Sequence, residues 1–243
     1  MLYSNELIDQ YENGKVMKAI LGGTSLFHTR IFDYWKEKNI TTPFGEVLIR
    51  IKGDGMFLQR HGIPPVNPHR INHRANIWAL KEMKAKMVIS INSVGSLKLR
   101  LKPGIFVIPH DFISFWDVPT FYESEMKNIV PVMDEGVRDV IIKKCKELNF
   151  TFKENGIYIQ TRGPRFETKA EVNFLKRIGD IVGMTMASEA TLCMEYDLPY
   201  GSLCSIDNYC HGIIKKPLTL KELEKNWKKN AKNIETFIEK ILE

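Results

Sequence analysis

Cysteine is scarce in this chain, with four residues among 243. Cys145, Cys193, Cys204 and Cys210 form no CxxC pair and fall in no spacing typical of metal ligands. This pattern argues against a disulfide-rich secreted scaffold and against a zinc site. We therefore expect a reduced, cytoplasmic protein with no metal.

Long apolar runs are also absent. No run approaches the roughly 20 residues that a membrane-spanning helix needs, and the polar, acidic N-terminus carries no signal-peptide pattern. Hydrophobic residues make up 44% of the chain and charged residues 26%, which is ordinary for a soluble globular protein. With no linker, internal repeat or low-complexity tract, we expect residues 1–243 to form one domain without membrane contact.

Basic motifs typical of nucleic-acid binding are missing as well. The formal net charge is +6, but the lysines are mixed with glutamates and no basic stripe alternates with aromatic residues. We therefore expect no nucleic-acid partner. A positive field still favours small anionic ligands such as phosphate.

The dinucleotide motif GxGxxG does not occur, although a buried strand runs into a glycine turn at Gly22 and Gly23. Backbone amides in such a turn, together with the Thr24 hydroxyl, form a common phosphate cradle. A second strand ends in Arg60 and His61. Arginine suits a bidentate grip on phosphate oxygens, and a structural ion pair is the alternative for Arg60.

Three further strands end in small or polar groups: residues 87–97 at Ser93 and Gly95, residues 180–184 before Thr185, and residues 200–206 before Asp207 and Asn208. Helices are expected over 71–83, 136–148, 169–177 and 217–243, and another helix is expected to contain Glu189. Alternating strands and helices predict an α/β fold, and ligands of such folds bind at the carboxyl edge of the sheet. Five strands are each followed by a group that can bind phosphate or a purine base. Their position at one edge of the sheet indicates a shared ligand site.

The segment QTRGPRFETKAE, residues 160–171, follows another apolar run. Gly163 and Pro164 break the strand, and Phe166 and Glu167 then offer an aromatic face beside a carboxylate. That pair suits a heterocycle that stacks and donates an N–H. The alternative places Phe166 in the core and Glu167 in the first turn of a helix, where the dipole favours it.

Read together and in order, GGT, RHG, INHRANIWALK, SVGSL, RGPRFETKAE, GMTMASE and SIDNY resemble the trimeric purine nucleoside phosphorylases, and most nearly the methylthioadenosine phosphorylase branch. The resemblance implies a single-domain, three-layer α/β/α fold with a mixed, partly barrel-like sheet. It implies phosphorolysis of the N-glycosidic bond of purine nucleosides, with inorganic phosphate as co-substrate and no metal or organic cofactor. It also implies a homotrimer or a hexamer built as a dimer of trimers, with a neighbouring subunit completing the 5′ pocket.

Carried onto this sequence, the resemblance assigns each subsite. Phosphate would be bound by Thr24, Arg60, His61, Ser93 (through its backbone N–H) and Thr185, ribose by Met184, the base by Phe166, Glu167 and Asn208, and the 5′ substituent by Leu220 and Glu224. Of these, Asn208, His61 and Arg60 would carry the catalysis. Bound phosphate supplies the nucleophile and a countercharge to a cationic sugar, so no nucleophilic side chain is required.

Asn208 and Glu167 favour a 6-oxopurine. An amide can accept from N7–H and donate to a 6-keto oxygen, and a carboxylate can accept from N1–H, which adenine lacks. Inosine, guanosine and methylthioinosine therefore remain open as substrates. A shift of one residue would instead place Asp207 at the base and favour methylthioadenosine.

Two alternative functions also remain open. Arg162 stands where relatives carry glutamate, and Ser25 replaces a glycine, which motivates a non-catalytic purine-binding homologue. A nucleoside hydrolase is the third reading, and it would cleave its substrate without phosphate.

Overall fold

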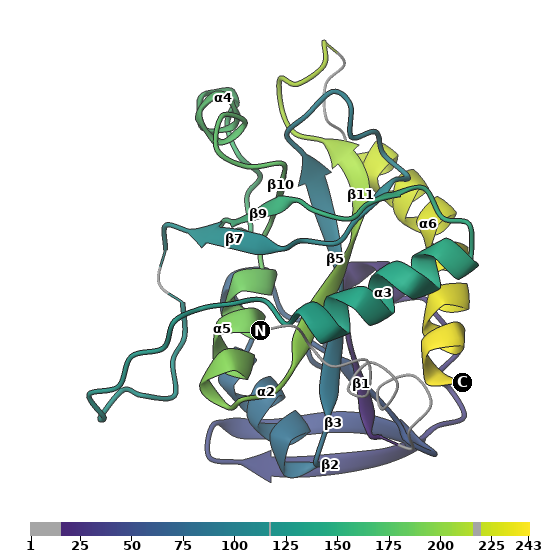
Figure 1. The fold of residues 1–243 in the computed structure, drawn as a ribbon, viewed down its shortest axis with the longest axis vertical. Helices are drawn as coiled ribbons and strands as arrows, with labels where there is room; N and C mark the ends of the chain where they lie inside the picture. Colours follow the sequence, from purple (N-terminus) through teal and green to yellow (C-terminus); the bar gives the residue numbers. More distant parts are fainter. Residues whose placement is uncertain (1–15, 117, 216–219) are drawn as a thin grey trace.

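The computed structural model describes residues 16–116, 118–215 and 220–243; in the last range, side chains are described for Asn226 and residues 230–243. These residues form an 11-stranded mixed sheet with helices on both faces (Figure 1). The strands are β1 (Lys18–Gly22), β2 (Lys36–Thr42), β3 (Gly45–Lys52), β4 (Gly55–Gln59), β5 (Met87–Ser96), β6 (Phe106–Val107), β7 (Asp111–Ser114), β8 (Phe152–Lys153), β9 (Ile157–Gln160), β10 (Ile181–Gly183) and β11 (Tyr200–Tyr209). The helices are α2 (His73–Glu82), α3 (Glu135–Glu147), α4 (Lys169–Leu175), α5 (Met186–Glu195) and α6 (Leu220–Leu242), with the short 3-10 turns η1 (Thr24–Leu26) and η2 (Pro68–Arg70).

The centre of the sheet is parallel and buried. β1 lies between β4 and β5 and is parallel to both, and β11 runs parallel to β5 on its other side. Every residue of β1 and β11 except Tyr209 is buried, because helices cover both faces of the sheet.

Two helix pairs cover the two faces (Figure 1). Side chains of α2 and α5, including Ile77 and Leu192, belong to one buried apolar cluster. Side chains of α3 and α6, including Ile141 and Phe237, belong to a second. The three-layer α/β/α architecture that the resemblance implied is confirmed.

β5 extends beyond its neighbours, and this opens a gap in the sheet. On one side of β5 the ladder with β1 ends at Ser90, and the ladder with β10 begins at Gly95. Between these positions no described strand pairs with that side of β5. β10 is antiparallel to β5, and β9 is parallel to β10, so this part of the sheet runs in the opposite direction.

The predicted elements agree closely with the structure, with three differences. β2 was missed because five of its seven residues are exposed and show no alternation, and β8 was missed because it has two residues. The predicted end of the last strand at Ile206 is wrong, since β11 continues to Tyr209. The start of the helix predicted over 217–243 lies outside the described residues. None of the helices that the structure describes has the length and apolar character required to cross a membrane.

Candidate active site

A cavity of about 290 Å³ opens at the gap beside β5. Its wall includes all of the side chains predicted to bind phosphate, ribose and base: Thr24, Arg60, His61, Ser93, Phe166, Glu167, Met184, Thr185 and Asn208. The side chains of Leu220 and Glu224, predicted for the 5′ pocket, lie outside the described part of the chain.

These residues reach the cavity from opposite directions. The parallel strands β1, β4, β5 and β11 bring Thr24, Arg60, Ser93 and Asn208. β9 and β10 run in the opposite direction, and Met184 and Thr185 follow the end of β10. The prediction that all of these groups lie at one sheet edge is therefore wrong, although they do meet in one cavity.

Arg60 is buried and almost fully paired. Its Nε donates to Oε1 of Glu189 at 2.5 Å, and its Nη1 donates to the carbonyl oxygen of Ile91 at 2.9 Å. Its Nη2 donates to the carbonyl oxygen of Leu21 at 2.9 Å and to Oγ of Ser90 at 2.6 Å. Both interpretations of Arg60 apply, since it forms a structural ion pair and also lies on the cavity wall. A bidentate grip on phosphate is not available, because a single N–H, on Nη1, remains without a partner among the described residues.

Glu189 holds Arg60 in this position, and no motif in the sequence indicated a functional role for Glu189. The carboxylate is fully buried. Besides Arg60, it accepts hydrogen bonds from Ser90 Oγ at 2.7 Å and Tyr200 Oη at 3.0 Å. Glycine is required nearby, since a Cβ at Gly23 would collide with Nη1 of Arg60.

His61 is oriented by the backbone. Its Nδ1 lies 2.8 Å from the carbonyl oxygen of Val66, and its ring meets the Phe27 ring edge-on, with 5.3 Å between centroids. Burial is the largest cause of a lowered pKa for His61, partly offset by the hydrogen bond to Val66.

Hydroxyl groups and one backbone amide complete this end of the cavity. Thr24 Oγ1 donates to Ser93 Oγ at 3.1 Å. Thr185 Oγ1 accepts from Asn92 Nδ2 at 2.9 Å, which leaves its own proton free to donate to a ligand. Alternate residues of a strand point their backbone groups to the same side, and the Ile91 carbonyl faces Arg60. The N–H of Ser93 therefore points into the gap beside β5.

The other end of the cavity carries an aromatic ring and a carboxylate. Phe166 is 42% exposed, so the alternative that placed it in the core is wrong. Glu167 precedes Thr168, the N-cap of α4, and so it lies outside the helix. Its carboxylate is buried and accepts from Thr161 Oγ1 at 2.7 Å, and burial is the main reason that its pKa is raised.

A β-bulge places two neighbouring polar residues on the cavity wall. Ile206 pairs with Val94 and Asn208 with Gly95, which leaves Asp207 as the extra residue. Oδ1 of Asp207 accepts from Ser205 Oγ at 2.9 Å and from Asn230 Nδ2 of α6 at 3.3 Å.

Asn208 occupies space that Gly95 leaves. A Cβ on Gly95 would lie 3.2 Å from Nδ2 of Asn208 and 2.7 Å from Sγ of Cys210. The residue pattern did not indicate the bulge, which depends on pairing with a strand more than 100 positions away.

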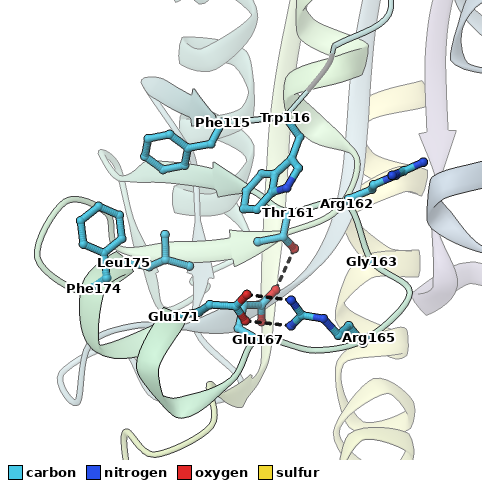
Figure 2. Close-up of a pocket in the computed structure, with 10 residues that line it drawn as sticks. All are labelled: Phe115, Trp116, Thr161, Arg162, Gly163, Arg165, Glu167, Glu171, Phe174 and Leu175. Atoms are coloured by element: carbon cyan, nitrogen blue, oxygen red, sulfur yellow. Dashed lines mark hydrogen bonds and ion pairs between the residues drawn. The ribbon is translucent and has the colours of Figure 1, made fainter.

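A second cavity, of about 420 Å³, adjoins the first (Figure 2). Phe115, Trp116 and Phe174 line it beside a bidentate ion pair of Arg165 with Glu171. Glu167 lies on the walls of both cavities. Arg162 also lines the second cavity, but its side chain extends away from the ion pair (Figure 2).

Comparison with known proteins links this cavity to one family. The sequence model of the phosphorylase superfamily matches residues 19–243. A protein of Archaeoglobus fulgidus named as a probable 6-oxopurine nucleoside phosphorylase is 38% identical, over 93% of this chain and 96% of its own. One of Methanocaldococcus jannaschii named as a probable S-methyl-5′-thioinosine phosphorylase is 41% identical, over 93% of this chain and 90% of its own. The solved structure of methylthioadenosine phosphorylase from Schistosoma mansoni in complex with adenine superposes with a TM-score of 0.83 at 25% identity, covering 93% of this chain and 91% of that one.

Proposed function

Because the chain belongs to the phosphorylase superfamily, we propose that it cleaves 6-oxopurine nucleosides with inorganic phosphate, releasing the free base and a (methylthio)ribose 1-phosphate. One observation carries this proposal. Asn208 and Glu167, which can read a 6-oxopurine, line the same cavity as the residues suited to phosphate.

The phosphate end supplies donors around an oxyanion. Thr24, Ser93 and Thr185 offer hydroxyl or backbone donors, and Arg60 offers one N–H. Phosphate held there beneath C1′ is both the nucleophile and a countercharge to the cationic sugar that forms as the bond to the base breaks. Met184, just before Thr185 on the cavity wall, is suited to contact the ribose.

The other end of the cavity supplies an aromatic surface for the face of the purine and polar groups for its edge. The Phe166 ring provides an apolar surface, the amide of Asn208 suits N7–H and the 6-keto oxygen, and a carboxylate oxygen of Glu167 suits N1–H. A hydrogen bond to a protonated N7 stabilises the departing purine.

The bulge in β11 supports Asn208 over Asp207 as the residue that reads the base. Asp207 Oδ1 accepts hydrogen bonds from Ser205 and from Asn230 of α6. The amide of Asn208 enters the space left by Gly95, and one N–H of its Nδ2 donates to the Tyr209 carbonyl oxygen at 2.9 Å, so its second N–H and its Oδ1 are available to a base. The names of the two relatives also refer to 6-oxopurine and thioinosine substrates.

The test is release of free base from inosine, guanosine, methylthioinosine, adenosine and methylthioadenosine, each with and without phosphate. We expect phosphate-dependent release of hypoxanthine or guanine. Release of adenine alone would keep the reaction and overturn the base assignment in favour of Asp207. Release without phosphate would indicate a hydrolase, and no release from any substrate would indicate a non-catalytic purine-binding protein.

We further propose that the protein acts in the cytoplasm without an organic cofactor, as a homotrimer or a dimer of trimers. The exposed rings of Phe115, Trp116 and Phe174, which are 55%, 41% and 57% exposed beside Glu167, support a contact with a neighbouring subunit. Light scattering coupled to size-exclusion chromatography should give three or six times the mass of the chain. A monomeric mass would contradict this assembly.

A further inference from the structure

The ring of His61 has a defined donor side. A carbonyl oxygen only accepts hydrogen bonds, so the contact of Nδ1 with the Val66 carbonyl, 2.8 Å long, places a proton on Nδ1. In the neutral ring Nε2 then carries a lone pair. Among the described residues Nε2 has no hydrogen-bond partner, and His61 lines the cavity. Burial lowers the pKa of His61, which favours this neutral form near neutral pH.

The positive charge of Arg60, beside His61, is already neutralised by an ion pair. Arg60 is the only lysine or arginine on the described wall of the cavity, and Glu189 pairs with it while both side chains are almost completely buried. One N–H of Arg60 remains for a ligand. The anion end of the cavity therefore offers hydroxyl and N–H donors, one lone pair at Nε2 of His61, and little uncompensated positive charge.

We propose that this site selects an oxyanion that carries its own proton, with the O–H of hydrogen phosphate donating to Nε2 of His61, and that it discriminates against sulfate. The inference rests on the proposed function, in which this end of the cavity binds inorganic phosphate. Sulfate has similar size and shape but no proton near neutral pH. Its oxygen would face the lone pair of Nε2, where the hydrogen bond is lost and two acceptors are opposed.

This arrangement also fits the reaction. The proton stays on the phosphate oxygen that faces His61, so the other oxygens are unprotonated. One of them can attack C1′ while the electrons of the C1′–N bond leave with the purine. Arsenate carries a proton under the same conditions and should replace phosphate.

The experiment is calorimetric titration of the whole protein with phosphate, arsenate and sulfate near neutral pH at constant ionic strength. We expect sulfate to bind at least about tenfold more weakly than phosphate, with arsenate close to phosphate. In His61→Gln the amide places an N–H at the position of Nε2, so the ratio of the two affinities should fall towards one. His110→Gln, the same change at an exposed histidine that does not line the cavity, should leave the ratio unchanged.

The unmodified protein gives an independent test if His61→Gln does not fold. Sulfate does not change its protonation between about pH 8 and about pH 5, whereas His61 gains a proton at Nε2 as the pH falls. Sulfate affinity should therefore rise over this range. Arg60, Glu189 and His73 act on His61 electrostatically, and Glu167, Asp207 and His211 line the same cavity. Arg60 is already paired with Glu189.

Equal affinity for sulfate and phosphate near neutral pH, or an unchanged ratio in a folded His61→Gln protein, would overturn the inference. If base release depends on phosphate while sulfate binds equally well, this inference fails and the proposed function stands. If sulfate is rejected but no nucleoside is cleaved, the proposed function fails and the selection of a protonated anion stands.

Discussion

The ion pair of Arg60 and Glu189 lies beneath the cavity, and both side chains are almost completely buried. A charge enclosed in this way needs its partner, because water cannot replace it. Tyr200 and Ser90 also donate to the same carboxylate. The pair therefore fixes the guanidinium at the cavity wall and limits how much positive charge a ligand can use.

Replacement of Glu189 by glutamine should strongly destabilise the folded protein. The variant would leave Arg60 charged and buried with a neutral partner, and we expect the free energy of unfolding to fall by about 3–5 kcal/mol. Urea denaturation measures this change.

The matched control is Glu37→Gln, which removes the carboxylate from an Arg50–Glu37 pair whose side chains are 26% and 54% exposed. That change should lower the free energy of unfolding by less than about 1 kcal/mol. Similar losses in the two variants would show that burial does not set the strength of the Arg60 pair.

Asn208 and Asp207 are adjacent, but the structure gives them different surroundings. Asn208→Asp would remove the donor for a 6-keto oxygen and add an acceptor suited to a 6-amino group. We expect the ratio of kcat/KM for adenosine to that for inosine to rise by about tenfold or more. Steady-state assays of both nucleosides measure it.

Asp207→Asn is the control for this prediction. An asparagine there can still accept from Ser205 and Asn230, so base preference should not change. A shift in Asp207→Asn and none in Asn208→Asp would assign the base to Asp207.

At the scale of single elements, α4 carries the Phe166–Glu167 turn on its N-terminus. Thr168 and Glu171 form a capping box: Thr168 Oγ1 accepts from the Glu171 N–H at 3.2 Å, and the Glu171 carboxylate accepts from the Thr168 N–H at 2.7 Å. The helix is seven residues long and too short to be stable on its own. Its cap therefore helps to hold Glu167 towards the cavity.

Thr168→Ala should lower the free energy of unfolding by about 1 kcal/mol. It should also raise KM for the nucleoside, because the neighbouring Glu167 loses its fixed backbone. Thr168→Ser keeps an accepting oxygen and should match the original protein in both urea denaturation and KM. If Thr168→Ala leaves KM unchanged, the cap does not position Glu167.

The sequence was most informative where an element is local. The strand over Met87–Ser96 and the helix over His73–Glu82 follow from apolar pattern and length, and both are present as predicted. The motifs also predicted residues that line the cavity, because each of them lies in a strand or shortly after one.

Non-local features were not predictable in this way. The direction of β10, the bulge at Asp207 and the partner of Arg60 depend on which strands lie side by side. No local pattern encodes that arrangement. Glu189 in α5 lies 129 positions from Arg60 in the sequence, and only the fold brings the two side chains into contact.

At the scale of the whole molecule, one buried histidine should make stability depend on pH. His73 is buried at the start of α2, and its Nδ1 has no partner among the described residues. Burial lowers its pKa from 6.5 to about 4. Above pH 6.5 the ring is neutral in both states. As the pH falls towards 4 the unfolded chain takes up the proton first, so the folded state loses stability.

The loss attributable to His73 should reach about 3 kcal/mol between those limits. In His73→Gln, the free energy of unfolding measured by urea denaturation should fall by that much less over the same range. His69→Gln, at an exposed position, should retain the original pH dependence. A parallel pH profile for His73→Gln would exclude His73 as the cause.

The way the cavity is assembled has a consequence for how the chain folds. Its wall draws on residues from Thr24 to His211, and its contacts join segments 69 and 129 positions apart. β11, which carries Asn208 and pairs with β5, follows all the other described strands in the sequence. Closing such distant pairs is slow compared with forming local structure. A chain interrupted before β11 would contain every residue proposed to bind phosphate and still lack the strand that carries Asn208, so binding of a base in the cavity requires that β11 has paired with β5.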